Sequence, residues 1–326
     1  MAPEMINGER TTTSVDMFSL GCVFYYVLSQ GQHPFGDVLR RQANILTGEY
    51  NLDYLEKILP LEEVLIAKIL IRAMISARAH CRPPCETVLK YPLFWGKQSI
   101  LNFLQEVSDH VENSGARAAA DEAARTLEVG GVGVVRGDWR ARVCAAVAGD
   151  LRARRTYRGD RVVHLLRALR NKKHHYRELD SEVRNSLGRL PDGFVTYWLR
   201  RFPLLLPHVW LQMQQYRHED ILQAYYPHSF TFQREDVPEL DESNYNEELP
   251  QEMCDPDKNE LFVKSKVFYD DNDKEPKYNG SPRKYTNWRS EMQARTRQDD
   301  VRLRDRHYKK KEKKSEEMPV WTLPPQ

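Results

Sequence analysis

The stretch that decides the fold is Thr156-Tyr-Arg-Gly-Asp-Arg-Val-Val-His-Leu-Leu-Arg-Ala-Leu-Arg-Asn-Lys-Lys-His-His-Tyr-Arg-Glu-Leu179. Between Val162 and Leu169 its apolar residues recur at helical spacing, which predicts a helix with one buried face. An unbroken polar run, Arg170 to His175, follows. Cations attract phosphate, and imidazoles exchange protons near neutral pH. With a tyrosine nearby, the stretch indicates a site for metal-free phosphodiester cleavage, and a solvated basic surface is the alternative interpretation.

Charge is unevenly distributed along the chain of 326 residues, whose formal net charge is only +2. From Arg136 to Arg217, 18 lysines and arginines stand against 7 acidic residues. This local excess favours a polyanionic partner.

The flanking segments predict helices and no strands. Upstream we expect a buried helix over 15–28, a core-facing helix over 61–74 and a further helical stretch over 96–125. The Ala- and Gly-rich piece 117–133 offers few side chains for packing. Downstream we expect a helix over 181–187 that stops at Gly188 and another over 194–202 that is capped by Asp192. The expected fold class is therefore all-α.

Three other features limit the function classes. The 5 cysteines are odd in number and scattered, which suits a reducing compartment without a disulfide framework. No apolar run approaches the roughly 18 to 20 residues needed to cross a bilayer, so we expect a soluble, cytoplasmic chain without a membrane segment. Residues 235–287 predict disorder. Residues 288–317 predict a solvated charged helix.

The first 95 residues resemble the second half of a protein-kinase C-terminal lobe. The motifs that carry the resemblance occur in the family's order: Ala2-Pro-Glu4, Asp16-Met-Phe-Ser-Leu-Gly21, His33-Pro-Phe-Gly36 and Arg82-Pro83. The resemblance implies that Glu4 and Arg82 form a buried ion pair and that Asp16 has a structural role. The Gly-rich loop, the strand lysine, the His-Arg-Asp loop and the Asp-Phe-Gly motif are absent from the sequence. We therefore expect no ATP or magnesium site and no kinase activity in this chain, because the family's ATP/ADP and magnesium ligands lie in the missing part. Whether Met1 is the natural start is open.

The central region resembles the KEN-type nuclease domain of the inositol-requiring kinase/endoribonuclease of the unfolded protein response, and ribonuclease L is related. The resemblance rests on four motifs: Arg170-Asn-Lys-Lys-His-His-Tyr-Arg-Glu-Leu179, Phe194-Val-Thr-Tyr197, Arg201-Phe-Pro203 and Tyr225-Tyr226. It implies three parts: a partial kinase lobe (1–95), a KEN ribonuclease domain (96–229) and a charged, mostly disordered tail (230–326).

The resemblance implies metal-independent cleavage of RNA stem-loops to 2′,3′-cyclic phosphate and 5′-hydroxyl ends, as in mRNA splicing or decay. Matched to the motif, His175 is the general acid, and Tyr157 is the base or orients the 2′-hydroxyl. Arg170 and Asn171 hold the scissile phosphate, and Lys172 adds positive charge. Only the family pattern prefers His175 to His174, because both imidazoles titrate.

The resemblance also implies that the partners are RNA stem-loops and either a second copy of the chain, in a homodimer, or longer family members. The longer family members lie at the cytosolic face of the endoplasmic reticulum. The alternative is a catalytically silent fragment that pairs with full-length proteins.

The proposed roles make a geometric demand. Tyr157 precedes the predicted helix, whereas His175 follows it. A loop at Gly159 must therefore fold Tyr157 back along the helix, with Asp160 as the expected cap. The run from Asn171 to His175 must leave the helix or turn so that His175 faces the same pocket.

Overall fold

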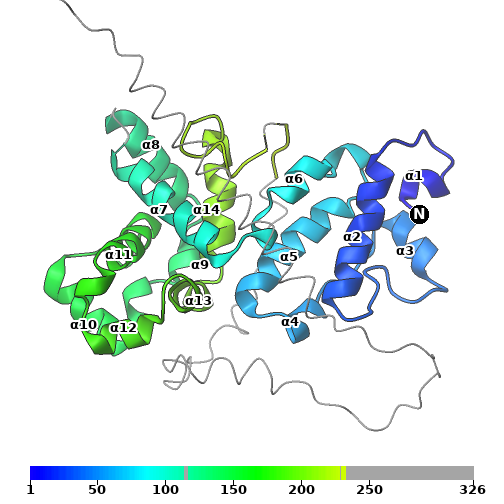
Figure 1. The fold of residues 1–326 in the computed structure, drawn as a ribbon. Coiled ribbons are helices and arrows are strands. Elements are labelled where there is room, and N and C mark those ends of the chain that lie inside the picture. The colour runs from blue at the N-terminus through cyan, green and yellow to red at the C-terminus, as the bar shows by residue number, and fades with distance from the viewer. Residues whose placement is uncertain (114–116, 228, 233–326) are drawn as a thin grey trace, which may run out of the picture. The chain divides into compact units, whose positions relative to one another are not determined.

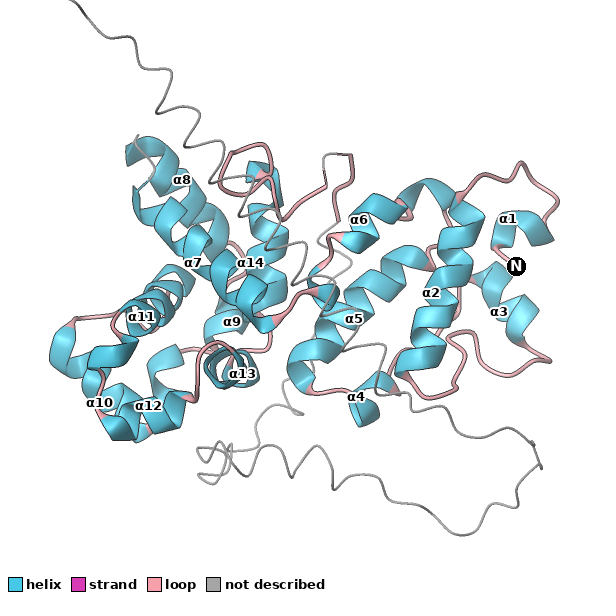
Figure 2. Ribbon diagram, in the orientation of Figure 1, coloured by secondary structure: helices cyan, strands magenta, loops and turns pink. Residues whose placement is uncertain are grey.

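The computed structural model describes residues 1–113, 117–227 and 229–232. All regular structure in these ranges is helical (Figures 1 and 2), which confirms the predicted fold class. The sequence-based predictions for 235–287 and 288–317 lie outside the described residues.

The N-terminal region contains six α-helices: α1 (Pro3–Ile6), α2 (Ser14–Leu28), α3 (Arg41–Thr47), α4 (Leu55–Ile58), α5 (Leu61–Met74) and α6 (Cys85–Leu89). Its core lies between α2 and α5, and Phe18 of α2 stacks on Phe35 at 5.5 Å between ring centroids. The two helices meet at Gly21, where a Cβ would stand 2.8 Å from Met74 Cβ. Glycine is therefore required there for close packing.

Helix α2 is less buried than its composition predicts. Phe18, Gly21 and Tyr25 face the core, whereas Val23 and Tyr26 are 52% and 54% exposed. The helix buries only the side that faces α4 and α5.

The predicted ion pair of this region is present. Arg82 Nη1 donates to Glu4 Oε1 at 2.6 Å, and Arg82 Nη2 donates to Glu4 Oε2 at 2.9 Å. Both residues are buried. Asp16 is exposed in the first turn of α2 and makes no side-chain hydrogen bond within the described residues.

Among the described residues from 97 onward there are eight α-helices: α7 (Lys97–Asn113), α8 (Arg117–Glu128), α9 (Val132–Val135), α10 (Ala145–Arg154), α11 (Val162–His174), α12 (Ser181–Leu187), α13 (Asp192–Arg201) and α14 (Leu205–Met213). Helix α7 is central, because α8, α11, α13 and α14 all pack against it, and α10 packs against α12. The short 3₁₀ helix η3 (Trp139–Ala141) precedes α10.

Two local predictions for these helices differ from the structure. Helix α8 does contribute to the core, since Ala123 and Leu127 are fully buried against its neighbours. Asp192 is the first residue of α13 rather than its cap, and the N-cap is Pro191. Gly188 stops α12 as predicted, with φ at +73°.

Aromatic packing joins the two regions. Tyr91 lies edge-on to Trp210 of α14 at 5.0 Å between ring centroids, and Trp210 stacks on Tyr226. Lys90 Nζ donates to the Tyr226 carbonyl at 3.0 Å. Residues 1–93 and the described residues from 97 onward accordingly form one compact unit. The domain boundary near residue 95 stays a prediction.

Candidate active site

The candidate active site is a pocket of about 300 Å³ at the C-terminal end of α11. Its lining combines apolar, cationic and proton-transferring side chains: Leu151, Arg155, Tyr157, Asn171, Lys172, His175 and Leu179. Four of the five residues predicted to carry the chemistry line this pocket, and Arg170 does not.

Helix α11 is longer than predicted, and its helical periodicity places Asn171 and His175 on the same face. It continues through His174, and His175 is its C-cap, with the His175 amide donating to the Asn171 carbonyl at 3.0 Å. Residues four apart share a helical face. Asn171 and His175 therefore face the same pocket although the run does not leave the helix at Arg170.

Tyr157 folds back along the helix, as the geometric argument required. Asn171 Nδ2 donates to the Tyr157 hydroxyl at 3.0 Å, and the phenol is only 7% exposed. Its ring lies edge-on to Trp139 and to His164, with centroids 5.9 and 6.3 Å away. The hydroxyl thereby reaches the far end of α11.

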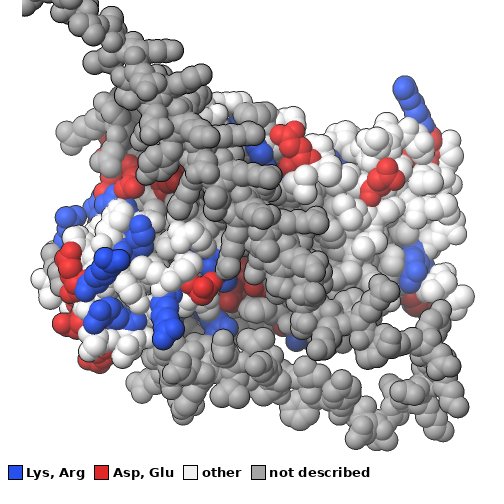
Figure 3. Space-filling model, viewed as in Figure 1, with Lys and Arg blue, Asp and Glu red and all other residues white. Residues whose placement is uncertain are grey.

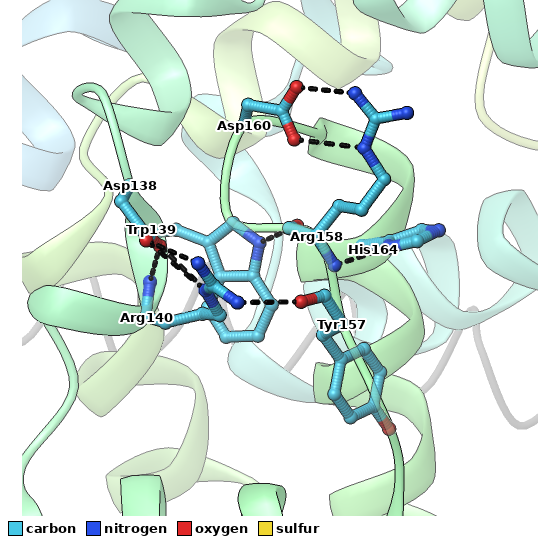
Figure 4. Close-up of polar contacts among 7 residues, drawn as sticks. All are labelled: Asp138, Trp139, Arg140, Tyr157, Arg158, Asp160 and His164. Carbon is cyan, nitrogen blue, oxygen red and sulfur yellow. Dashed lines mark hydrogen bonds and ion pairs between the residues drawn. The ribbon is translucent and has the colours of Figure 1, made fainter.

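The loop that carries Tyr157 is attached to η3 (Figure 4). Trp139 Nε1 donates to the Arg158 carbonyl and the Trp139 amide donates to the Gly159 carbonyl, each at 3.0 Å. A Cβ on Gly159 would lie 1.7 Å from Asp138 Oδ1, so only glycine permits this approach.

The start of α11 is capped by a side chain of another helix and not by Asp160, as the sequence had predicted. Asp160 pairs with Arg158 at 2.7 Å, so the predicted cap was wrong. The carboxylate of Glu128, at the end of α8, accepts from the amides of Val162 and Val163, each at 3.1 Å.

His175 is the exposed member of the site, with 59% of its side chain accessible. Its Nδ1 lies 3.0 Å from Glu178 Oε2, three residues further on. If Nδ1–H donates to this carboxylate, Nε2 is left to exchange a proton with a ligand. Glu178 was not among the residues predicted from the sequence, although its spacing of three from His175 could have indicated it.

His174 points elsewhere. Its Nε2 lies 3.3 Å from Gln105 Nε2 of α7, and it does not line the pocket. Burial, followed by the charge of Lys173, lowers the pKa of His174.

Arg170 is directed at α7 rather than at the pocket. It pairs with Asp109 at 2.8 Å and closely with Glu112, and only 10% of its side chain is accessible. Its Nη2 also donates to Asn171 Oδ1 at 3.3 Å. In this arrangement Arg170 orients the Asn171 amide.

Lys172 lines the pocket but is closely paired with Asp150 of α10, and both side chains are nearly inaccessible. Burial lowers the pKa of the Lys172 ammonium to about 8, whereas contact with the carboxylate favours its charged form. No local sequence pattern identified Asp150 as this partner.

The cations available to a ligand are a different set from Arg170 and Lys172, the cations of the predicted site. Arg155 lines the pocket and is exposed. Further exposed arginines lie on or beside α10 and α12: Arg142, Arg152, Arg177, Arg184 and Arg189. Figure 3 shows lysine and arginine side chains gathered on the face of the molecule over these helices. This surface suits a polyanion.

The described residues contain neither a cluster of metal ligands nor a membrane-spanning helix. No group of three or more His, Cys, Asp or Glu side chains is placed to hold a metal ion. None of the helices in the described part has both the length and the apolar character of a membrane span.

A phenol, an amide and an imidazole line an open, cation-bordered pocket in this helical part of the chain, and such an arrangement suits acid–base chemistry on an anionic substrate. The family model described as ribonuclease 2-5A matches residues 100–226. Over these residues the chain is similar to that family, and its relatives include serine/threonine-protein kinase/endoribonucleases.

Three relatives illustrate the relationship. The human serine/threonine-protein kinase/endoribonuclease IRE2 is 46% identical over 230 residues, which are 70% of this chain and 24% of the relative. The Caenorhabditis elegans protein ire-1 is 43% identical over 226 residues, 69% of this chain and 23% of the relative. The Schizosaccharomyces pombe sensor for unfolded proteins in the ER, ire1, is 38% identical over 211 residues, 65% of this chain and 19% of the relative. The chain spans about a quarter or less of the length of these relatives.

Proposed function

We propose that this chain is a metal-independent endoribonuclease. The observation that carries the proposal is that the Tyr157 hydroxyl, the Asn171 amide and the His175 imidazole share one open pocket. The relatives' printed name, endoribonuclease, supports RNA as the substrate.

The proposed reaction is an internal transfer at one phosphodiester. The ribose 2′-oxygen forms a bond to phosphorus and the bond from phosphorus to the 5′-oxygen breaks, which yields 2′,3′-cyclic phosphate and 5′-hydroxyl ends. Tyr157 accepts the 2′-proton or orients the 2′-hydroxyl. His175, protonated, donates a proton to the leaving 5′-oxygen.

The remaining residues position the phosphate and compensate its charge. Asn171 donates to a phosphate oxygen, and Lys172 and Arg155 add positive charge at the pocket. Arg170, in contrast to the role implied by the motif, acts through Asn171 from outside the pocket.

Stem-loop RNA is the proposed substrate, and a second copy of the chain or a longer relative is the proposed partner. The S. pombe relative's printed name, sensor for unfolded proteins in the ER, supports a role in the unfolded protein response. The cytosolic side of the endoplasmic reticulum is the proposed location.

The test is cleavage of a hairpin RNA in EDTA at rising protein concentration, with analysis of the product ends. We expect cyclic phosphate ends, and a loss of about 10²- to 10⁴-fold in His175→Ala. His174→Ala is the matched control and should stay close to the parent. No cleavage at any concentration would favour the silent interaction fragment instead.

A further inference from the structure

The loop between α10 and α11 places Tyr157 without any regular secondary structure. Residues 155–158 lie outside every helix of the structure. The position of a side chain on such a segment depends on the individual hydrogen bonds of its backbone as well as on its own contacts. The groups that bind this backbone therefore help to decide where the phenol lies.

A single peptide unit of this loop is held at both of its polar atoms (Figure 4). The carbonyl of Tyr157 accepts from Arg140 Nη1 at 2.9 Å. The amide of Arg158, which belongs to the same peptide unit, donates to His164 Nδ1 at 2.7 Å. Arg140, the donor, and His164, the acceptor, bind opposite edges of the planar Tyr157–Arg158 peptide unit. The peptide plane therefore cannot rotate without losing both hydrogen bonds.

Arg140 is fixed for this task by Asp138. The carboxylate binds Arg140 Nε at 2.9 Å and Nη2 at 2.6 Å. The guanidinium therefore has Nη1 left for the Tyr157 carbonyl. Because a planar guanidinium has a rigid geometry, the two bonds to Asp138 also fix the direction of the third.

His164 is bound in one defined protonation state. Because the Arg158 amide is the donor, Nδ1 must carry a lone pair, so the ring is neutral with its proton on Nε2. Burial, then the charges of Arg167 and Arg161, lowers the pKa of His164, and Glu128 opposes them. The ring also packs edge-on against the Tyr157 ring.

We propose that His164 and Arg140 are positioning residues that fix the Tyr157 hydroxyl in the pocket by holding the peptide unit between Tyr157 and Arg158. We call the two hydrogen bonds from Arg140 and to His164 at this peptide unit the clamp. The inference rests on the proposed function for its effect on catalysis, but the clamp itself is testable without RNA.

The first experiment measures the clamp directly. Amide hydrogen exchange of Arg158 and the ¹⁵N shifts of the His164 ring are recorded in the free chain. We expect a protected Arg158 amide, an unprotonated Nδ1, and loss of protection in His164→Ala. A fast-exchanging Arg158 amide in the parent, or unchanged protection in His164→Ala, overturns the clamp whether or not the chain cleaves RNA.

The second experiment measures its effect on cleavage. His164→Ala should lower kcat by about 10- to 100-fold, the cost of a misplaced catalytic group, with little change in KM. His164→Asn should recover most of the rate, because its side-chain oxygen can occupy the place of Nδ1. His80→Ala, an exposed histidine outside this loop, is the control. Equal losses of kcat in His164→Asn and His164→Ala would show that the hydrogen-bond acceptor for the Arg158 amide does not determine the rate.

A second pair of variants guards against a folding defect at His164. Arg140→Lys keeps the charge beside Asp138 but cannot bind both the carboxylate and the Tyr157 carbonyl in the same geometry. Its kcat should fall, whereas the kcat of Arg78→Lys, at an exposed arginine outside this loop and outside the cationic surface, should stay unchanged. Thermal unfolding checks that each variant is folded, and an unchanged kcat in folded Arg140→Lys contradicts the proposal. If the parent cleaves no RNA, the proposed function fails while the exchange experiment still decides the clamp.

Discussion

The Glu128 carboxylate accepts a hydrogen bond from the Val162 amide at 3.1 Å, although the two residues are 34 positions apart. The first amides of a helix lack partners within it. The end of α8 thus caps the start of α11, the helix that carries the site. A residue of the Ala- and Gly-rich piece, in which the sequence showed little capacity for packing, supports the active helix.

Removing this cap should destabilise the region that contains α8 and α11. Glu128→Ala leaves the amides of Val162 and Val163 without an acceptor, and we expect a loss of about 1 kcal/mol in the free energy of unfolding. Asp160→Ala, at the position where the sequence predicted the cap, should have a smaller effect because its pair with Arg158 is exposed. Urea unfolding of both variants checks the order, and a larger loss in Asp160→Ala would contradict it.

The Glu4–Arg82 pair should behave as a buried ion pair. Glu4→Gln leaves the Arg82 charge without its counter-charge, and the expected cost is about 3 to 5 kcal/mol. A hydrogen bond from Arg82 lowers the pKa of the Glu4 carboxyl, so this contribution is present above the normal carboxyl range and is lost as pH falls through the lowered value. A double-mutant cycle with Arg82→Met measures the coupling, and additive effects would contradict the prediction.

Arg170 should matter for stability as well as for cleavage. Arg170→Ala removes the cation that pairs with Asp109 and leaves Glu112 with Arg167, and we expect a loss of more than about 1 kcal/mol in the free energy of unfolding. Adding Asp109→Asn should recover part of this loss, because it removes the carboxylate that Arg170 neutralised. Thermal unfolding of the single and double variants is the measurement. A fully stable Arg170→Ala that has lost RNA affinity would instead restore the direct phosphate role that the motif implied.

Arg155 should contribute to RNA binding through its charge. Arg155→Ala should weaken hairpin binding and reduce the slope of log K against log salt by about 0.7 to 0.9. Arg125→Ala is the matched control, because that exposed arginine is already paired with Glu122 at 2.5 Å. Binding isotherms at several salt concentrations give the slopes, and equal slopes for the parent and Arg155→Ala would exclude the contact.

His33 should make the N-terminal region sensitive to acid. Its Nδ1 accepts from the Phe35 amide at 3.2 Å, and burial lowers its pKa to about 4. Between about pH 6.5 and pH 4 the unfolded chain binds a proton that the folded chain does not. The free energy of unfolding should therefore decrease as the pH is lowered through this window. His33→Asn keeps an acceptor without titrating and should flatten the dependence, as urea unfolding at pH 7 and pH 5 would show. His80→Asn is the control.

The sequence predicted those parts of the site that depend on local spacing. The apolar period from Val162 to Leu169 gave the helix and its buried face. The position of Gly159 indicated the return of Tyr157 toward the pocket. These features are read from neighbours within a few turns, and the structure contains them.

The missed features depend on residues distant in the chain. Asp109 and Glu112 lie about 60 positions before Arg170, and they direct its charge away from the pocket. The run of six polar residues also suggested that the helix ends near Arg170. Lysine, arginine and asparagine are compatible with a helix, so α11 continues to His174. Composition identified the cations, whereas only the fold shows which of them are already paired.

Because α11 is continuous, the position of each site residue around the helix axis decides whether it faces the pocket. The same rigid rod fixes Val162 in the core at one end and presents Asn171 and His175 to the pocket at the other. One residue inserted between Leu169 and Arg170 would rotate everything beyond it by about 100°. Every catalytic side chain would remain in the chain, and none would face Tyr157. Insertions and deletions in this helix are therefore far more damaging to the site than most exchanges of one side chain for another.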